Sequence, residues 1–185
     1  MIEFPKRIDC GDFELVKPVA TFNKAQEFFD IVKKNRDFLS QWLEWTDFYS
    51  KPEDAYNYLK TIEPLDKPSY LIQVDGKIVG GHGFVMFGER HRTAELGYWL
   101  APQFNGRGYV TRGIKYLEDL AFGKLGINRI QIRVDAENIK SQAVAERSGY
   151  VREGVLRGSY VLRGVSCDTI MYSKLKSEWE KGKQK

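Results

Sequence analysis

Two glycines set two residues apart, Gly106 and Gly108, stand between an apolar run that ends at Leu100 and an amphipathic run that begins at Tyr109. This order predicts a strand, a tight turn and a helix. The first turn of such a helix has unpaired backbone N–H groups at the positive end of the helix dipole. Because glycine has no Cβ, an anion can approach the backbone there closely. The pattern therefore predicts a pyrophosphate-binding turn, and a plain turn that caps the helix is the alternative.

The spacing of this turn, Gln103-x-x-Gly106-x-Gly108, narrows the chemistry. It differs from a dinucleotide fingerprint and from a P-loop, and no Lys-Ser/Thr pair follows it, which argues against a nucleoside triphosphatase. Arg107 and Arg112 could add positive charge at the rim of the turn.

A second group of residues, two of them polar, is spaced for one side of a helix. Asn138, Ser141 and Ala145 are three and four residues apart. From spacing alone, the favoured interpretation is that Asn138 caps the helix and Ser141 is a solvated hydroxyl. The alternative is that both side chains face a ligand.

The bulk composition excludes several classes of protein. The chain has 185 residues, enough for one domain with a full core, and 29 basic against 25 acidic residues give a net charge of +4. This mild charge does not argue for direct nucleic-acid binding. No apolar run approaches the ~20 residues that span a membrane, and the N-terminus has no signal-peptide pattern. A cytoplasmic protein is expected.

Cysteine and histidine usage argues against a metal site. Cys10 and Cys167 are far apart and fit no metal spacing, so reduced thiols are expected. His82 and His91 are the only histidines, and neither belongs to a ligand or Ser-His-Asp pattern. We expect no metal cofactor.

The elements that position these residues follow from periodicity and turn signals. Thr21 is a candidate cap for a first helix, and Ser50, with Pro52 in the first turn and Glu53 three residues after the cap, for a later one. Asp75-Gly76 predicts a two-residue hairpin turn. The expected strands cover residues 13–16, 70–74, 77–87, 93–100, 130–134, 151–162 and 165–173. The helix after Gly108 separates two of them, so that pair is expected to be parallel. The tail from Ser177 to Lys185 is expected to be disordered.

Several motifs together resemble one family. They are Glu95-Leu96-Gly97-Tyr98-Trp99-Leu100, Gln103-x-x-Gly106-x-Gly108, Asn138-x-x-Ser141 and Arg147-Ser148-Gly149-Tyr150-x-x-Glu153-Gly154, preceded by Asn35-Arg36-Asp37-Phe38-Leu39-x-x-Trp42-Leu43-x-Trp45. Their order resembles the GCN5-related N-acetyltransferases (GNAT), in the RimL/RimJ-type branch of ribosomal-protein N-terminal acetyltransferases. The resemblance covers roughly residues 10–175. It implies one α/β (α+β) domain over residues 1–185, with a mixed, mostly antiparallel sheet of about seven strands flanked by helices.

The resemblance also implies a co-substrate, acetyl-CoA, and its position. The thioester arm would lie along the strand that contains Tyr98 and Trp99, and the pyrophosphate at the glycine turn. The implied cofactor-binding residues are Tyr98, Trp99, Leu100, Gln103, Asn105, Gly106, Arg107, Gly108, Tyr109, Val110, Thr111, Asn138 and Ser141.

Two residues are candidates for catalysis of amine attack on the thioester. Glu95 lies on the strand that should flank the acetyl group and is the candidate base; the alternative is an exposed carboxylate in an ion pair. Backbone N–H groups near Gly97 and Tyr98 could polarise the thioester carbonyl. Ser141 is the candidate proton donor to the leaving thiolate, because Ala145 stands where many family members have a tyrosine.

The acceptor side is defined less sharply. Trp42, Trp45 and Phe48 could line a substrate groove. The alternative is a core stripe made of Phe38, Leu39, Trp42 and Leu43. Tyr160 stands where some family members use a glutamate to grip the substrate amine, so it is a candidate substrate-binding residue.

The expected function is acetyl transfer to a primary amine, with the N-terminal α-amine of a ribosomal protein as the leading acceptor. The alternatives are a small-amine acetyltransferase, acting on an antibiotic, polyamine or amino acid, and a non-catalytic acyl-CoA sensor. A homodimer is compatible with the family.

Overall fold

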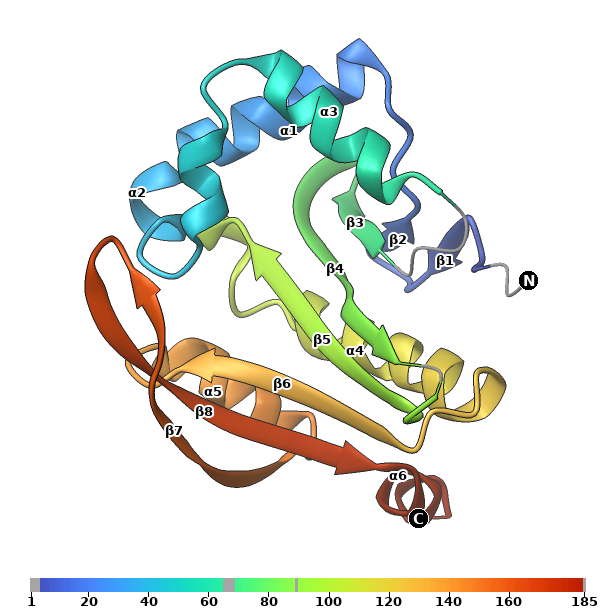
Figure 1. The fold of residues 1–185 in the computed structure, drawn as a ribbon. Coiled ribbons are helices and arrows are strands. Elements are labelled where there is room, and N and C mark those ends of the chain that lie inside the picture. The colour runs from blue at the N-terminus through green and yellow to red at the C-terminus, as the bar shows by residue number, and fades with distance from the viewer. Residues whose placement is uncertain (1–3, 65–68, 89, 185) are drawn as a thin grey trace. The chain divides into compact units, whose positions relative to one another are not determined.

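The computed structural model describes residues 4–64, 69–88 and 90–184 (Figure 1). The chain divides into two compact units, one of Met1–Gly83 with Tyr98–Val110 and the other of Phe84–Gly97 with Thr111–Lys185. Strands β4 (Lys77–Gly88) and β5 (Thr93–Leu100) each contribute residues to both units.

The first unit holds an antiparallel meander. Strand β3 pairs on one side with β2 and on the other with β4, and β1 pairs with β2. The bounds are Arg7–Asp9 for β1, Glu14–Val16 for β2 and Ser69–Val74 for β3. The predicted two-residue turn at Asp75-Gly76 joins β3 to β4.

Two helices of the first unit pack against each other, α1 (Phe22–Lys34) and α3 (Pro52–Ile62) (Figure 1). Helix α1 begins as predicted, because the Thr21 side chain accepts a hydrogen bond from the Lys24 N–H. Its apolar face is buried with residues of α3 and of the meander; this core comprises Ala25, Phe28, Phe29, Val32, Tyr49, Ala55, Leu59, Leu71 and Ile78. The shorter helices α2 (Arg36–Leu39) and η1 (Glu44–Phe48) connect α1 to α3.

The start of α3 differs from the prediction. Lys51, not Ser50, is the cap residue, and Asp54, not Glu53, closes the turn. The Asp54 Oδ2 atom accepts hydrogen bonds from the Lys51 N–H at 3.0 Å and the Ser50 N–H at 2.9 Å. These donors hold the pKa of Asp54 below its ordinary value, with the Ser50 hydroxyl as the first contributor.

The second unit contains the single parallel pair recorded among the described strands, β5 with β6 (Arg129–Asp135), which confirms that prediction. Strand β6 pairs antiparallel with β8 (Val165–Leu175), and β8 with β7 (Val151–Leu162). Strand β7 is an edge strand, and its register with β8 shifts between Arg152 and Gly154 and between Leu156 and Tyr160.

The helices near these strands follow the predicted pattern. Helix α4 (Tyr109–Glu118) continues into a π-helical turn, η3 (Asp119–Lys124), and α5 (Ile139–Arg147) follows β6. The predicted apolar stripe of α4 and η3 is buried at Val110, Ile114, Leu117 and Ala121.

Two predictions about the chain as a whole need correction. The sheet has eight strands rather than about seven, because β1 was not expected. The tail is helical rather than disordered over α6 (Lys176–Lys183), while Lys185 lies outside the described residues. The Trp179 Nε1–H donates to Asp119 Oδ1 at 3.0 Å, and its ring centroid lies 5.7 Å from that of Phe122. Among the described residues, none of the helices is both long and apolar enough to cross a membrane.

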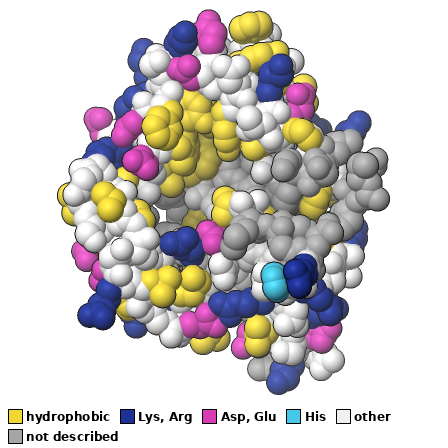
Figure 2. Space-filling model, in the orientation of Figure 1, with side chains coloured by type: hydrophobic (Ala, Val, Ile, Leu, Met, Phe, Trp, Pro, Cys, Tyr) yellow, Lys and Arg dark blue, Asp and Glu magenta, His cyan; other side chains and the backbone are white. Residues whose placement is uncertain are grey.

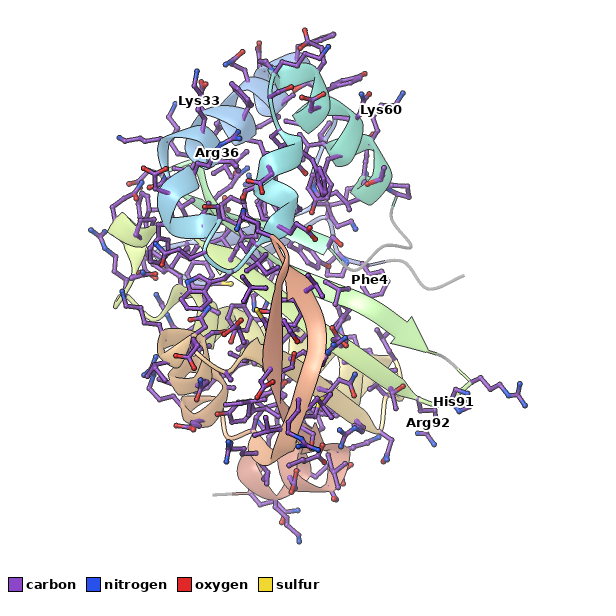
Figure 3. All side chains as sticks on the ribbon, turned by 60° about the vertical axis from the view of Figure 1, so that its left-hand side comes forward. Phe4, Lys33, Arg36, Lys60, His91 and Arg92 are labelled. Carbon is purple, nitrogen blue, oxygen red and sulfur yellow. The ribbon has the colours of Figure 1, made fainter. Side chains whose placement is uncertain are left out.

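Two arginines labelled in Figure 3, Arg36 and Arg92, each form a hydrogen bond with a loop of their own unit. In the first unit, Arg36 donates a hydrogen bond to the Tyr49 carbonyl. In the second, the Arg92 Nε–H donates to the Gly126 carbonyl at 2.7 Å, and the Arg92 carbonyl accepts from the Asn128 N–H at 2.7 Å. These contacts tie each loop to a segment distant in sequence.

Candidate active site

The glycine turn, which joins β5 to α4, lies in the first unit. The Ala101 N–H donates to the Val79 carbonyl at 2.9 Å, which fixes the start of the turn on β4, and η2 (Pro102–Phe104) follows. Gly106 and Gly108 have φ angles of 78° and 74°, in the left-handed region that residues with a Cβ avoid. The backbone from Asn105 to Gly108 is exposed, and a Cβ at Gly106 would meet no atom within 4 Å. The turn thus presents open backbone at the start of a helix, as a pyrophosphate site requires.

The residues after this turn anchor the first helical turn. Tyr109 and Val110 are buried, and the Tyr109 ring centroid lies 5.1 Å from that of Phe13. The Arg107 guanidinium lies 5.7 Å from the centroid of the Phe104 ring. Gln103 and Asn105 are exposed. An anchored helix start beside an exposed turn is a suitable anion site, because its N–H groups need no reorganisation on binding.

We expect Gly106→Val to weaken acetyl-CoA binding about tenfold or more. Valine strongly disfavours a φ of 78°, so the turn must change its conformation or carry a strain of about 1–3 kcal/mol. Isothermal titration calorimetry with acetyl-CoA measures the change in Kd. Gly182→Ala on α6, where a Cβ also meets nothing within 4 Å, is the control. Unchanged affinity in Gly106→Val would contradict the assignment of the turn.

Of the aromatic residues that were predicted to line a substrate groove, one packs against the core and another is exposed to solvent. The Trp45 ring lies 5.5 Å from that of Tyr49 and 5.7 Å from that of Trp99, and it packs against the core. Phe48 has an exposed fraction of 69%, whereas Trp42 is half-buried. Trp45 is therefore partly buried against the core, while Phe48 is open to solvent.

Glu95 lies at the end of the parallel ladder in the second unit. Glu95 and Gln131 are the last pair of the β5–β6 register, and the Gln131 Nε2–H donates to Glu95 Oε2 at 3.1 Å. Glu95 is half-buried, and among the described lysines and arginines none forms an ion pair with it. The alternative interpretation, an exposed carboxylate in an ion pair, does not describe this contact.

Helix α5 shows the capping role of Asn138. Its Oδ1 atom accepts a hydrogen bond from the Ser141 N–H at 3.1 Å, which confirms the predicted cap. Ser141 is half-buried, so its hydroxyl is not simply a solvated group. Ala145, at the position where many family members have a tyrosine, is fully buried and carries no polar side-chain group.

Tyr160 has a partner that the sequence analysis did not identify. Its hydroxyl donates a hydrogen bond to the Asp135 carboxylate. Burial, and then this carboxylate, raise the pKa of Tyr160, so the phenol keeps its proton. The Asp135 Oδ1 atom also accepts from the Glu137 N–H at 2.6 Å. The one feature of the sequence that could have indicated this contact is a carboxylate, Asp135, at the end of an alternating strand and close to the Asn138 motif.

A charged pair crosses from β6 to β7. Arg129 donates two hydrogen bonds of 2.6 Å to the Glu153 carboxylate, and the Ser173 hydroxyl donates a third at 2.8 Å. The Arg129 hydrogen bond and then the Ser173 one lower the pKa of Glu153 to about 2 from 4.5. The carboxylate therefore remains ionised well into the acid range.

We expect this pair to contribute stability that is present above about pH 4.5 and lost as the pH falls towards about 2. The Glu153 side chain has an exposed fraction of 41%, so solvent screening limits the contribution to about 1 kcal/mol. Urea unfolding at several pH values should show a shallower acid decline for Glu153→Gln than for the wild type. Glu180→Gln, from a 3.9 Å surface pair, is the control. Parallel curves for Glu153→Gln and wild type would refute this assignment.

The predicted site residues fall into two sets. Trp42, Trp45, Phe48, Tyr98, Trp99, Leu100 and Gln103 to Val110 belong to the first unit, and Glu95, Thr111, Asn138, Ser141 and Tyr160 to the second. Within the described part of the chain, no group of three or more His, Cys, Asp or Glu residues could hold a metal ion.

Comparison with known proteins identifies the family of this chain. The family model of the acetyltransferase (GNAT) domain matches residues 15–151. The chain is 33% identical over 164 residues to "Putative ribosomal N-acetyltransferase YdaF" of Bacillus subtilis (strain 168), covering 84% of this chain and 88% of that protein. It is 25% identical over 157 residues to the ribosomal-protein-serine acetyltransferase of Escherichia coli (strain K12), covering 83% and 88%.

A solved structure shows the same fold. The microcin C7 self-immunity acetyltransferase MccE, in complex with acetyl-CoA and AMP, superposes with a TM-score of 0.84 at 29% identity, covering 93% of this chain and 97% of that one. The chain therefore belongs to the GNAT family of acetyl-CoA-dependent N-acetyltransferases.

Proposed function

We propose that this enzyme acetylates the N-terminal α-amine of a protein, with a ribosomal protein as the leading acceptor. The observation that carries the proposal is the half-buried Glu95 carboxylate, which Gln131 holds at the end of the β5–β6 ladder. The two relatives named for ribosomal substrates support this choice of acceptor. Such a substrate would place the reaction in the cytoplasm, as the sequence predicts.

The proton balance of the reaction favours an α-amine. An α-amine has a pKa near ~7.7–8 and a lysine amine near ~10.4, so a much larger fraction of α-amines is neutral at physiological pH. A weak base is then sufficient. The amine nitrogen attacks the thioester carbonyl, and Glu95 accepts the proton that the nitrogen loses, directly or through water. The C–S bond breaks as the C–N bond is completed, and the thiolate leaves.

The remaining site residues have separate tasks in this proposal. The turn at Gly106 and Gly108, with the helix start at Tyr109, would hold the pyrophosphate of acetyl-CoA. Ser141 would donate a proton or a hydrogen bond to the departing thiolate, whose thiol has an ordinary pKa near ~8.5. Trp45 and Phe48 would contact the acceptor.

We expect Ser141→Ala to lower kcat by about tenfold, with little change in the KM for acetyl-CoA, because a thiolate leaves readily without strong acid assistance. The Ser141 N–H remains to bind Asn138, so the helix cap is retained. Thiol release at saturating substrates measures the effect. Wild-type turnover in Ser141→Ala would remove the hydroxyl from the mechanism.

A panel of acceptors tests the proposed function. Thiol release from acetyl-CoA should be fastest with an acidic peptide that begins with serine or alanine. A lysine peptide with a blocked N-terminus, spermidine and an aminoglycoside are the comparison amines. Release with a small amine alone would replace the proposal by small-amine acetylation, and release with no amine would favour a sensor of acyl-CoA.

A further inference from the structure

Trp99 rests directly on a glycine pair of the neighbouring strand, entirely within the first unit. A Cβ built on Gly81 would lie 2.4 Å from the Trp99 Nε1 atom, and 3.1 and 3.2 Å from its Cδ1 and Cε2 atoms. A Cβ on Gly80 would lie 2.4 Å from the Trp99 carbonyl oxygen. A Cβ atom essentially never lies as close as 2.4 Å to another heavy atom, so an alanine at either position would force the strand or the indole to shift.

The same indole also lies close to two aromatic residues of the helices. Its centroid lies 5.6 Å from that of Phe28 and 5.7 Å from that of Trp45, with interplanar angles of 79° and 66°. Edge-to-face contacts of this kind contribute beyond simple burial and fix the relative orientation of the rings. Phe28 is buried and belongs to the core, so it gives the indole a rigid neighbour.

Trp45 is the residue of this group that continues to the surface. It lies on η1, three residues before the exposed Phe48. Hydrophobic side chains gather on the face of the first unit shown in Figure 2. A stack of contacts thus begins at Gly81, passes through Trp99 and ends at Trp45 on η1.

We propose that Trp99, seated on Gly81, is a positioning residue that sets the place of Trp45 on the acceptor side of the site. The proposal rests on the proposed function, in which Trp45 contacts the acceptor. It gives the Trp99 side chain a role different from binding acetyl-CoA, while its backbone remains part of β5. Gly81 then affects acceptor recognition without touching the acceptor.

The stack has a spectroscopic signature that does not depend on activity. Two indoles 5.7 Å apart couple their electronic transitions, so the wild type should show an exciton couplet in far-ultraviolet circular dichroism. Trp99→Phe and Trp45→Phe should each abolish the couplet. Gly81→Ala should change it by displacing the indole. Gly154→Ala, on β7 where a Cβ meets nothing within 4 Å, is the matched strand control and should leave it unchanged.

Steady-state kinetics then distinguishes a role of Trp99 in positioning Trp45 from a role in packing alone. With whichever panel amine the wild type acetylates, Gly81→Ala should raise the acceptor KM about tenfold or more, because a misplaced contact of about 1.4 kcal/mol is a factor of ten. The KM for acetyl-CoA should change little. Trp99→Phe has a smaller ring at the point of the clash, so the double variant Gly81→Ala/Trp99→Phe should bind the acceptor better than Gly81→Ala alone. If Gly81→Ala does not fold, Trp99→Phe alone should show the rise in acceptor KM.

The outcomes are distinguishable from failure of the proposed function. An inactive wild type would refute the proposed function, and the couplet would still test the stack. An unchanged couplet in Gly81→Ala overturns the positioning proposal whatever the activity. An active enzyme with unchanged acceptor KM in Gly81→Ala and Trp99→Phe also overturns it, as does an equal rise in both KM values.

Discussion

We expect Glu95→Gln to lower kcat by about 10²–10⁴-fold, the usual contribution of a general base. Glutamine keeps the shape of the side chain, and its carbonyl oxygen can still accept the hydrogen bond from Gln131. It cannot accept a proton from the attacking amine. The KM for acetyl-CoA should therefore remain close to that of the wild type, and the loss should appear at saturating substrate.

The pH dependence of the Glu95→Gln reaction rate distinguishes the loss of a general base from a change in the shape of the site. Without a base, only acceptor molecules that are already neutral react, so the residual rate of Glu95→Gln should rise with pH through the acceptor's own pKa, near ~7.7–8 for an α-amine. A lysine acceptor would move that rise towards ~10.4. Glu153→Gln, another carboxylate of the second unit, is the control. A Glu95→Gln enzyme with normal kcat would exclude Glu95 from proton transfer.

The second large effect is expected at a buried ion pair, and it concerns stability. The Lys174 Nζ atom lies 2.8 Å from Glu118 Oε1, and the side chains have exposed fractions of 13% and 5%. Lys174 also donates to the Ser148 carbonyl at 2.5 Å and lies 5.1 Å from the centroid of the Tyr150 ring. Lys174→Met should lower the free energy of unfolding by about 3–5 kcal/mol, because it leaves a buried carboxylate without its partner.

The pH dependence and a double variant test this explanation. Burial raises the pKa of Glu118, although Lys174 opposes this shift. The contribution of Glu118 to the free energy of unfolding is therefore greatest below its ordinary pKa of 4.5, and it declines as the pH rises through the raised pKa. The loss in Lys174→Met should therefore be larger at neutral pH than in mild acid. Lys174→Met/Glu118→Gln should recover part of it, since no buried charge remains.

Urea unfolding measures both effects, with Lys176→Met as the control from a surface pair at 3.9 Å. A loss in Lys174→Met no larger than that control would show that the pair adds little. Glu118 is the last residue of α4, whose first turn follows the glycine turn.

The fold could largely be predicted from sequence where local signals were strong. The Asp75-Gly76 turn, the alternating strand of β5 and the apolar stripe of α4 each depend on residues close in sequence, and each formed as predicted. The predicted cap of α3 is wrong by one residue, because the carboxylates of Glu53 and Asp54 are both suitable to accept hydrogen bonds at the helix start. Only the geometry of the backbone selects Asp54.

The elements that were missed depend on distant contacts. Strand β1 has three residues, too few for its alternation to be a signal, and it is defined by its register with β2. Helix α6 is polar, and its Trp179 contacts Asp119 and Phe122 about sixty residues earlier in the chain. No local propensity could reveal such a partner.

The same distinction applies to the site. The glycine turn, Glu95 and Asn138 could be identified from motifs that are contiguous in sequence. The contact of Tyr160 with Asp135 and the seat of Trp99 on Gly81 could not, because each joins two separate strands. The role of Trp45 was undecided for the same reason, since its packing depends on Phe28 and Trp99.

The irregular register of β7 has a consequence for solubility at high concentration. An outermost strand of twelve residues, with exposed Val151, Val155, Leu156 and Val161, offers a template on which another chain could add a strand. The two breaks in its pairing with β8 interrupt that template, so that a straight intruding strand cannot bond along its whole length. These irregularities therefore protect the protein against edge-to-edge aggregation.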